Sequence, residues 1–513
     1  MAEAGVDPYG SRFTNITKNA DLRAAGERLG LEAGQISEAA EARFRSAGRL
    51  HLLRDTGKLI FATVRDWTGD LQWALSKKAI EEFTGGADSA GAPSGESPFP
   101  AGAAAWQAAK LLDLGDIVGA EGRLGRTKTG ELTLWVDRFR VLSKAVRPPP
   151  EKWHGLTDVE QRYRKRYVDL LANPESQQKF ILRARIIDYI RGVLRDRGFI
   201  EVETPVLQPI YGGAAARPFT THHNTLDMQL YLRISPELYL KRCMVGGLER
   251  VYEFARCFRN EGISPRHNPE FTMLELYQAY GDYHDMMDIT EAIIAGAARD
   301  VIGSTTIKFG EREIDYATPW PRRRYADLFA EHVGISIEDV PGVRERWHRH
   351  FGGRLKAAEG GVALQPPDDV IMISELFEHY VEDKLINPTF VIDYPAPLCP
   401  LTKRRPDDPR FALRFECFMN GMEMGNAYSE LNDPVVQHAT LAAQLRGEGD
   451  ETMAIMDEDF VEALEYAMPP AGGLGIGIDR LCMLLTGSES IREVLLFPLQ
   501  RATRAPESIN PSE

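Results

Sequence analysis

The feature that most constrains the fold is a run of alternating side chains that begins at Phe271 and ends at Tyr277. Successive side chains of a β-strand point to opposite faces, so Glu275 and Tyr277 share one face while Leu274 and Leu276 share the other. Residues 256–262 (RCFRNEG) form the end of a second expected strand and the start of a long polar loop. The two leucines need a core, which predicts a sheet with one apolar face and one polar face.

The loop that joins these strands carries side chains that suit a nucleotide. Arg259 and Glu261 stand at its entrance, His267 lies in its middle and Phe271 stands at its exit. A guanidinium binds phosphate, a carboxylate accepts from a base or an amine, and an aromatic ring stacks on a base. The alternative is a hairpin tied by a surface Arg–Glu pair. It would explain any two of these residues but not the whole set.

A second hairpin follows at residues 415–424, where Asn420 and Gly421 give the strongest two-residue turn signal. Counting outward from the turn, Glu416 faces Gly425, so Glu416 and Glu423 are diagonal neighbours on one face. Two carboxylates on an otherwise apolar face repel each other unless a cation lies between them, and Mg²⁺ bound to nucleotide phosphates would suit. The alternative is a pair of solvated carboxylates on an edge strand.

Strict alternation after this hairpin would turn Asn426, Tyr428 and Glu430 away from Glu423. A β-bulge near Gly425 would bring them back to the same face, because glycine tolerates the bulged conformation. We therefore expect a bulge at this position.

A glycine-rich run at residues 472–481 (GGLGIGIDRL) predicts a strand that leads into a helix with Arg480 in its first turn. Glycines allow a ligand to approach the backbone, and an arginine at a helix start can bind phosphate. No GxxxxGK[ST] motif occurs in the chain, so this is not a P-loop. Taken alone, the run fits tight strand–helix packing equally well.

Together these segments resemble the class II aminoacyl-tRNA synthetases, and the lysyl enzymes in particular. The resemblance includes residues 211–219, 234–239, 426–432 and 473–480, and it extends from about residue 47 to residue 501. It implies a lysine–tRNA ligase that activates L-lysine with ATP to lysyl-adenylate and transfers it to the 3′ end of lysine tRNA. Several carboxylates around one pocket also favour a substrate with a cationic side chain.

The resemblance also assigns residues to roles. The expected lysine-binding residues are Gly213, Glu237, Glu275, Tyr277, Asn426, Tyr428 and Glu430. The expected ATP-binding residues are Arg259, Glu261, His267, Asn268, Phe271 and Arg480, of which Arg259 and Arg480 are also the expected catalytic residues. Glu416 and Glu423 are the expected ligands of Mg²⁺, the one cofactor.

Short strands expected at residues 59–66, 71–74, 117–124 and 132–142 predict a small β-barrel. We expect an N-terminal helical segment at residues 1–45, an OB-fold anticodon-binding domain at 46–147 and the catalytic domain at 148–513. The catalytic part lacks βαβ alternation, which favours an α+β fold on an antiparallel sheet. Residues 85–103 form a low-complexity insert, and residues 335–367 a peripheral elaboration. By the resemblance, Phe61, Gln72 and Glu131 contact the anticodon.

Composition adds weaker expectations. A net charge of −14 disfavours non-specific nucleic-acid binding by the whole surface. A local basic cluster at residues 162–166 could bind nucleic acid or, as we favour, form a solvated helix face. Five cysteines without CxxC spacing, no N-terminal apolar segment and no run of membrane-spanning length predict a soluble, cytoplasmic protein. By the resemblance, Pro205 lies at the interface of a homodimer.

Two other readings remain open from the sequence. One is a paralogue that transfers lysine to a protein instead of tRNA, against which the barrel residues Phe61, Gln72 and Glu131 argue. The other is a non-catalytic, tRNA-binding regulator, against which the full set of active-site residues argues.

Overall fold

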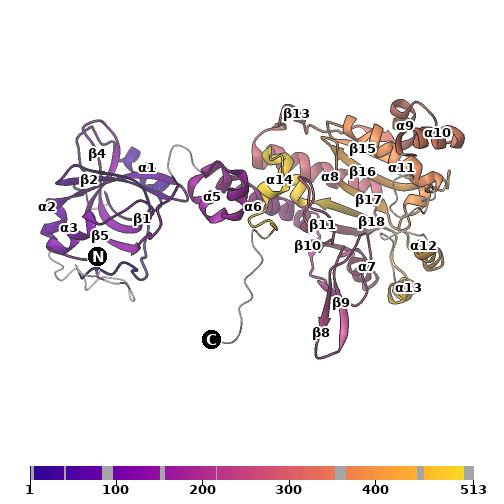
Figure 1. The fold of residues 1–513 in the computed structure, drawn as a ribbon, viewed down its shortest axis with the longest axis horizontal. Helices are drawn as coiled ribbons and strands as arrows, with labels where there is room; N and C mark the ends of the chain where they lie inside the picture. The colour runs from indigo at the N-terminus through magenta and orange to yellow at the C-terminus, as the bar shows by residue number, and fades with distance from the viewer. Residues whose placement is uncertain are drawn as a thin grey trace. The chain divides into compact units, whose positions relative to one another are not determined.

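The computed structural model describes residues 1, 5–39, 42–83, 96, 98–150, 156–214, 216–352, 366–446 and 456–501. The chain divides into two compact units, Met1–Thr157 and Asp158–Glu513, whose elements are labelled in Figure 1. Within the described ranges no helix is both long enough and apolar enough to cross a membrane.

The first unit is a closed barrel of strands in the order β1-β2-β3-β5-β4. Its strands are β1 (Arg43–Asp55), β2 (Leu59–Asp66), β3 (Gly69–Ser76), β4 (Ile117–Arg126) and β5 (Leu132–Ser143). Its helices are α1 (Asn19–Arg28), α2 (Lys77–Glu82) and α3 (Gly102–Lys110). Alternate residues of β2 are buried in the barrel core, and those between them face outward.

The second unit is built on an eight-stranded sheet in the order β14-β15-β16-β17-β18-β11-β10-β6. Its pairs are antiparallel except β14–β15 and β10–β6, which lie at the two edges. The sheet strands are β6 (Ile200–Glu201), β10 (Arg250–Phe258), β11 (Glu270–Ala279), β14 (Arg322–Arg324), β15 (Thr389–Pro395), β16 (Phe411–Met419), β17 (Met422–Ser429) and β18 (Ala471–Gly477). This arrangement confirms the predicted α+β fold, in which a domain on an antiparallel sheet follows an OB-fold barrel along the chain.

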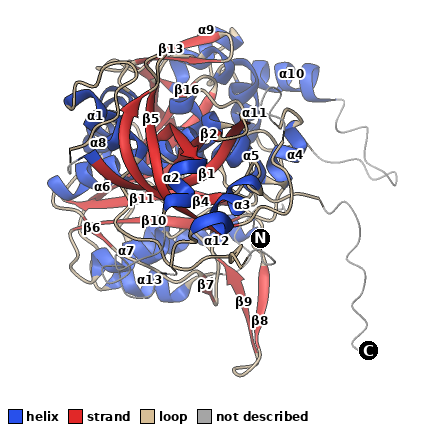
Figure 2. Cartoon of the chain, turned by 90° about the vertical axis from the view of Figure 1, so that its left-hand side faces the viewer, coloured by secondary structure: helices blue, strands red, loops and turns tan. Residues whose placement is uncertain are grey.

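Two small sheets accompany the large one. They contain β7 (Leu207–Gln208), β8 (Thr220–His223) and β9 (Met228–Leu232), and β12 (Thr306–Phe309) with β13 (Arg312–Asp315). The β8–β9 hairpin projects from the rest of the unit (Figure 2).

Helices complete the second unit. The longer ones are α6 (Pro174–Asp196), α8 (Tyr283–Ala297), α10 (Val340–Phe351), α11 (Asp369–Tyr380) and α12 (Pro434–Arg446). The shorter ones are α4 (Val159–Arg164), α5 (Arg166–Ala172), α7 (Glu237–Val245), α9 (Tyr325–Val333), α13 (Glu458–Glu465), α14 (Ile478–Thr486) and α15 (Ile491–Val494), with single turns η4 (Ala298–Ile302), η6 (Glu382–Lys384) and η7 (Ala396–Leu398). Buried side chains of α6, α8 and α14 pack with Leu274 and Leu276 against one face of the sheet. That packing leaves the other face for the polar residues.

The N-terminal part differs from the expected helical segment. Among its described residues it contains one helix, α1, and strand β1 already begins at Arg43. Strand β1 was not predicted because its side chains do not alternate cleanly between buried and exposed. Its pairing with β2 is also interrupted by an irregularity between Leu50 and Leu52. Most of the 85–103 insert and the end of the 335–367 elaboration lie outside the described residues.

The basic cluster at residues 162–166 has a structural role. Arg166 is 1% exposed and donates to Asp169 at 2.5 Å and to the backbone carbonyl of Arg492 at 2.7 Å. Arg162 also bonds Asp169, at 2.7 Å, and Arg164 bonds Glu160 at 2.9 Å. The three arginines are thus paired within the unit while Lys165 is exposed, and the buried Arg166 belongs neither to a free basic face nor to the solvated helix face that we favoured.

Candidate active site

The polar residues of the sheet lie in two rows that cross β16, β17, β18 and β11. The first row pairs Glu416, Asn426, Gly475 and Glu275. The second row pairs Arg414, Tyr428, Gly473 and Tyr277. Paired residues on adjacent strands, and residues two apart on one strand, point to the same face. The two hairpins predicted from the sequence therefore meet on one surface.

A β-bulge makes this alignment possible. Cys417 pairs with Gly425 while Phe418 pairs with Glu423, so Met424 is the extra residue. This confirms the bulge expected beside Gly425. It also changes one expected pair, because Glu416 now faces Asn426 instead of Gly425.

A cavity lies over the rows on the β11 side, and we call it the carboxylate cavity. The residues that form it include Gly213, Ser235, Glu237, Arg259, Glu275, Tyr277, Arg414, Asn426 and Tyr428. Glu275 accepts from the Ser235 hydroxyl at 2.9 Å and from the Tyr277 hydroxyl at 3.2 Å. Burial and then the neighbouring Glu237 raise the pKa of Glu275 to about 8, and these two hydrogen bonds offset the shift only in part. Glu275 is thus a largely neutral group that a bound cation would ionise.

Glu430, predicted to bind the lysine side chain, lies behind the wall of this cavity. It is fully buried, and its Oε2 forms an ion pair with Lys241 Nζ at 2.6 Å. The same Nζ lies 2.8 Å from Oε1 of Glu237, a residue that precedes Lys241 by one turn of helix α7. A Cβ atom on Gly473 would come within 2.0 Å of Glu430 Oε1, which explains why a glycine is required there.

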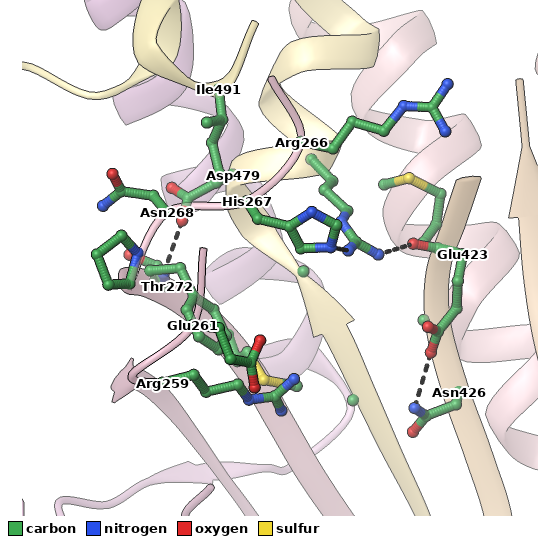
Figure 3. A pocket seen from close by; sticks show the side chains of 18 of the residues that line it. Arg259, Glu261, Arg266, His267, Asn268, Thr272, Glu423, Asn426, Asp479 and Ile491 are labelled. Carbon is green, nitrogen blue, oxygen red and sulfur yellow. Dashed lines mark hydrogen bonds between the residues drawn. The ribbon is translucent and has the colours of Figure 1, made fainter. Parts of the chain in front are cut away.

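A second cavity adjoins the first one, and we call it the nucleotide cavity (Figure 3). The predicted residues that line it are Arg259, Glu261, His267, Asn268, Phe271, Glu423, Asn426 and Arg480. Arg480 donates to the Glu423 carbonyl at 2.8 Å, and its other terminal nitrogen lies 3.0 Å from His267 Nε2. Burial and then Arg480 lower the pKa of His267, so the imidazole is neutral beside the guanidinium.

The two cavities share Arg259, Met273, Asn426 and Gly475. The Arg259 guanidinium carbon lies 5.1 Å from the centre of the Phe271 ring. Its Nε is buried and has no hydrogen-bond partner among the described residues. A donor of this kind, at the junction of the two cavities, suits an anionic group that two ligands share.

Glu416 and Glu423 differ in their surroundings. Glu423 lines the nucleotide cavity, and its Oε1 accepts from Asn426 at 2.9 Å. Glu416 lines neither cavity. Arg414 donates to one of its carboxylate oxygens, and the Tyr394 hydroxyl donates to the other at 2.9 Å. Burial raises the pKa of Glu416 to about 7; Arg414 opposes the shift and the nearby Glu423 adds to it. No cluster of three or more potential metal-ligand side chains occurs in the described ranges.

The predicted anticodon residues lie on the outer surface of the barrel. Phe61 is one of the outward residues of β2 and pairs with Ala74 of β3. Gln72 of β3 pairs with Thr133 of β5 and donates to its hydroxyl at 2.8 Å. Glu131 is exposed directly before β5. Phe61 and Gln72 therefore share the face that a single strand could contact.

Sequence reasoning missed two side chains that line the carboxylate cavity, Arg414 and Ser235, and one that is buried behind it, Lys241. Lys241 follows Glu237 by four residues, a helical spacing that could have indicated the pair. Arg414 precedes Glu416 by two residues and so shares its face. Ser235 carried no such signal, because it lies in the turn before α7.

Comparison with known proteins agrees with this geometry. Residues 158–501 match the family described as tRNA synthetases class II (D, K and N), and residues 45–142 match the OB-fold nucleic acid binding domain. The chain therefore belongs to the class II tRNA synthetases.

Full-length relatives narrow the assignment. A "Lysine--tRNA ligase" of Carboxydothermus hydrogenoformans is 48% identical over 507 residues, covering 98% of this chain and 96% of the relative. Relatives of the same name from Pelotomaculum thermopropionicum and Moorella thermoacetica are each 46% identical and cover 98% of this chain, with 92% and 95% of their own lengths matched. Within the class, the chain belongs to the lysine–tRNA ligase family.

Proposed function

We propose that the chain attaches lysine to its tRNA in two steps, using the carboxylate cavity for lysine and the nucleotide cavity for ATP. The observation that carries the proposal is the junction of the two cavities at Arg259. A lysine carboxylate and an ATP α-phosphate would meet there. The match to lysine–tRNA ligases along 98% of the chain supports the same activity.

Lysine recognition follows from charge. Glu237, which lines the cavity, accepts from the ε-ammonium group beside the Tyr277 ring, and Glu430, buried behind the wall, joins it after a side-chain rearrangement. Glu275 and the Gly213 backbone hold the α-ammonium group, and Arg259 holds the carboxylate end. An ammonium group has three donors and no acceptor, so it suits this set of carboxylates, whereas a neutral side chain would add no positive charge to balance them.

The first step is an in-line displacement. A lysine carboxylate oxygen forms a bond to the α-phosphorus of ATP, the bond from that phosphorus to the bridging oxygen breaks, and pyrophosphate leaves. The nucleophile is already an anion, so no general base is required. Arg259 and Arg480 neutralise the charge that develops on the phosphates, and the fixed positions of the two ligands supply alignment.

Magnesium fits the carboxylates Glu423 and Glu416. Both supply oxygen ligands, and a cation would relieve the repulsion between these two neighbouring carboxylates. Glu423 is the more accessible ligand, whereas Glu416 would have to release Arg414 or Tyr394. When bound, the ion would neutralise and orient the phosphates of ATP.

The second step transfers lysine to tRNA. The terminal ribose hydroxyl of the tRNA attacks the carbonyl carbon of the adenylate, an ester bond forms, the bond from that carbon to the phosphate oxygen breaks, and AMP leaves while the hydroxyl proton passes to its phosphate or to water. In the barrel, Phe61 would stack on an anticodon base while Gln72 and Glu131 contact base edges.

A homodimer is part of the proposal. The segment at Pro205 is exposed, as are Leu207, Phe497 and Leu499 at 47%, 73% and 57%. Phe497 and Leu499 line a largely apolar cavity together with residues of β9 and α6. Large apolar side chains that are exposed close to one another in this way are typical of a protein–protein contact. Light scattering should give twice the 57.4 kDa mass of one chain, and a Phe497→Asp variant should shift the protein to monomer.

We also propose a cytoplasmic location, because the five cysteines are free thiols and four of them are buried. Thiols of this kind persist in a reducing compartment.

One assay separates the candidate functions. ATP–pyrophosphate exchange should occur with lysine and not with the other amino acids. Exchange without charging of lysine tRNA would favour transfer to a protein, and tRNA binding without exchange would favour a regulator.

A further inference from the structure

The lysine site already contains a lysine of the chain itself. Lys241 is fully buried, and its Nζ lies 2.8 Å from Glu237 Oε1 and 2.6 Å from Glu430 Oε2. These are the two carboxylates proposed to bind the substrate ammonium group. Glu430 Oε1 is buried and has no hydrogen-bond partner in the described part of the chain.

A charge count shows what this arrangement does. Glu237 and Glu430 contribute two negative charges and Lys241 one positive charge. Arg414 is committed to Glu416, and Glu275 is largely neutral because burial raises its pKa to about 8. Among Glu237, Glu430 and Lys241, one negative charge is therefore left over when both carboxylates are ionised. One substrate ammonium group would bring the buried site to neutrality, which is the favourable condition in a low-dielectric interior.

We propose that Lys241 is a positioning residue that cancels one of the two carboxylate charges, so that the site retains one negative charge for the single side-chain ammonium of its substrate. This inference rests on the proposed function. It adds a residue to which no substrate role was assigned, and it explains why two buried carboxylates can face each other in the absence of a ligand.

The electrostatics of the group agree with the geometry. Burial alone would lower the pKa of Lys241, but Glu237 and Glu430 raise it above its usual value, so the amine stays charged. Burial raises the pKa of Glu430 to about 7, Lys241 opposes this shift and Glu237 adds to it. Loss of Lys241 would therefore raise the pKa of Glu430 further.

Charge balance makes a prediction that simple packing does not. Glu430→Gln leaves Glu237 fully compensated by Lys241, so a substrate ammonium would add an uncompensated buried charge. The lysine KM in pyrophosphate exchange should rise roughly 10- to 100-fold, with kcat and the ATP KM little changed. Adding Lys241→Met to this variant restores the single negative charge on Glu237. The double variant should therefore bind lysine several-fold more tightly than Glu430→Gln alone, although a second site residue has been removed.

A matched control comes from Lys403, whose charge reaches Glu430 but which does not bridge the two carboxylates. Lys403→Met in the Glu430→Gln background should not restore lysine binding. Lysine affinity of all variants is measured by calorimetry as well as by KM, and thermal unfolding checks that each is folded. If Glu430→Gln is unfolded, Glu237→Gln with and without Lys241→Met carries the same test.

A double variant that binds lysine no better than Glu430→Gln would overturn the inference and leave Lys241 as a structural ion pair. A parent protein without lysine-dependent exchange would instead overturn the proposed function. The two failures are therefore distinguishable.

Discussion

Replacing Phe61 by alanine should weaken tRNA binding while leaving adenylate formation intact. Phe61 faces outward from β2, and its neighbours Ile60 and Ala62 face the barrel core, each 1% exposed. The substitution therefore removes an aromatic platform without opening a cavity in the core. The catalytic rows belong to the other compact unit, so the activation step does not require this ring.

The expected magnitude follows from one stacked base. Loss of a base–aromatic stack costs about 1–3 kcal/mol, which corresponds to a roughly 5- to 150-fold increase in Kd for lysine tRNA. Because Phe61 packs on the outer surface, unfolding of the barrel should change by much less than the 3–5 kcal/mol of a buried Phe→Ala substitution.

Fluorescence anisotropy with labelled lysine tRNA measures the Kd, and pyrophosphate exchange without tRNA measures activation. Leu52→Ala is a matched control, because Leu52 is 45% exposed on β1 and pairs with the outward Thr63 of β2. It removes apolar surface from the same face but no ring. Unchanged tRNA binding in Phe61→Ala, or an equal loss in Leu52→Ala, would refute stacking by Phe61.

Three further predictions concern the catalytic unit. Glu423→Gln should raise the Mg²⁺ concentration needed for half-maximal exchange by roughly tenfold or more, since one charged ligand is lost; an unchanged Mg²⁺ requirement would remove this residue from the metal site. The pKa of Glu275 is raised to about 8, so the free protein is protonated there below that pH and must release the proton when the α-ammonium binds. The lysine KM should accordingly fall about tenfold as pH rises from about 7 to about 9, and Glu275→Gln, assayed with the same substrate, should lack this fall. Arg166→Met leaves the fully buried Asp169 without one of its partners. It should lower the free energy of unfolding of the catalytic unit by about 3 kcal/mol or more, measured from the urea midpoint. A decrease below about 1 kcal/mol would contradict a stabilising role for this buried ion pair.

Alternation and turn chemistry were sufficient to predict the main features of the site. The polar face of β11, the Asn420–Gly421 turn, with both residues at positive φ, and the bulge beside Gly425 all follow from local rules. The barrel was predicted from four of its five strands. Each of these features depends on residues close together in the sequence.

What could not be predicted depends on long-range register. The sequence gives no reason why β11 and β17 should lie on either side of β18, and that order decides which residues share a row. The partners of Glu416 and Glu430 depend in the same way on side chains from β15 and α7. The expected set of lysine-binding residues was therefore incomplete, because it included the carboxylates of Glu237, Glu275 and Glu430 but not Lys241.

The glycines of β18 limit how this enzyme could be redesigned for larger amino acids. Gly473 and Gly475 lie between the side chains of β11 and those of β17, and neither glycine has a side chain that could be shortened to enlarge the carboxylate cavity. A mutagenesis library aimed at bulkier lysine derivatives should therefore keep these two glycines. It should vary the side chains that line the cavity on β17 and in the Leu398–Thr402 segment. A side chain added at either glycine would make the carboxylate cavity smaller.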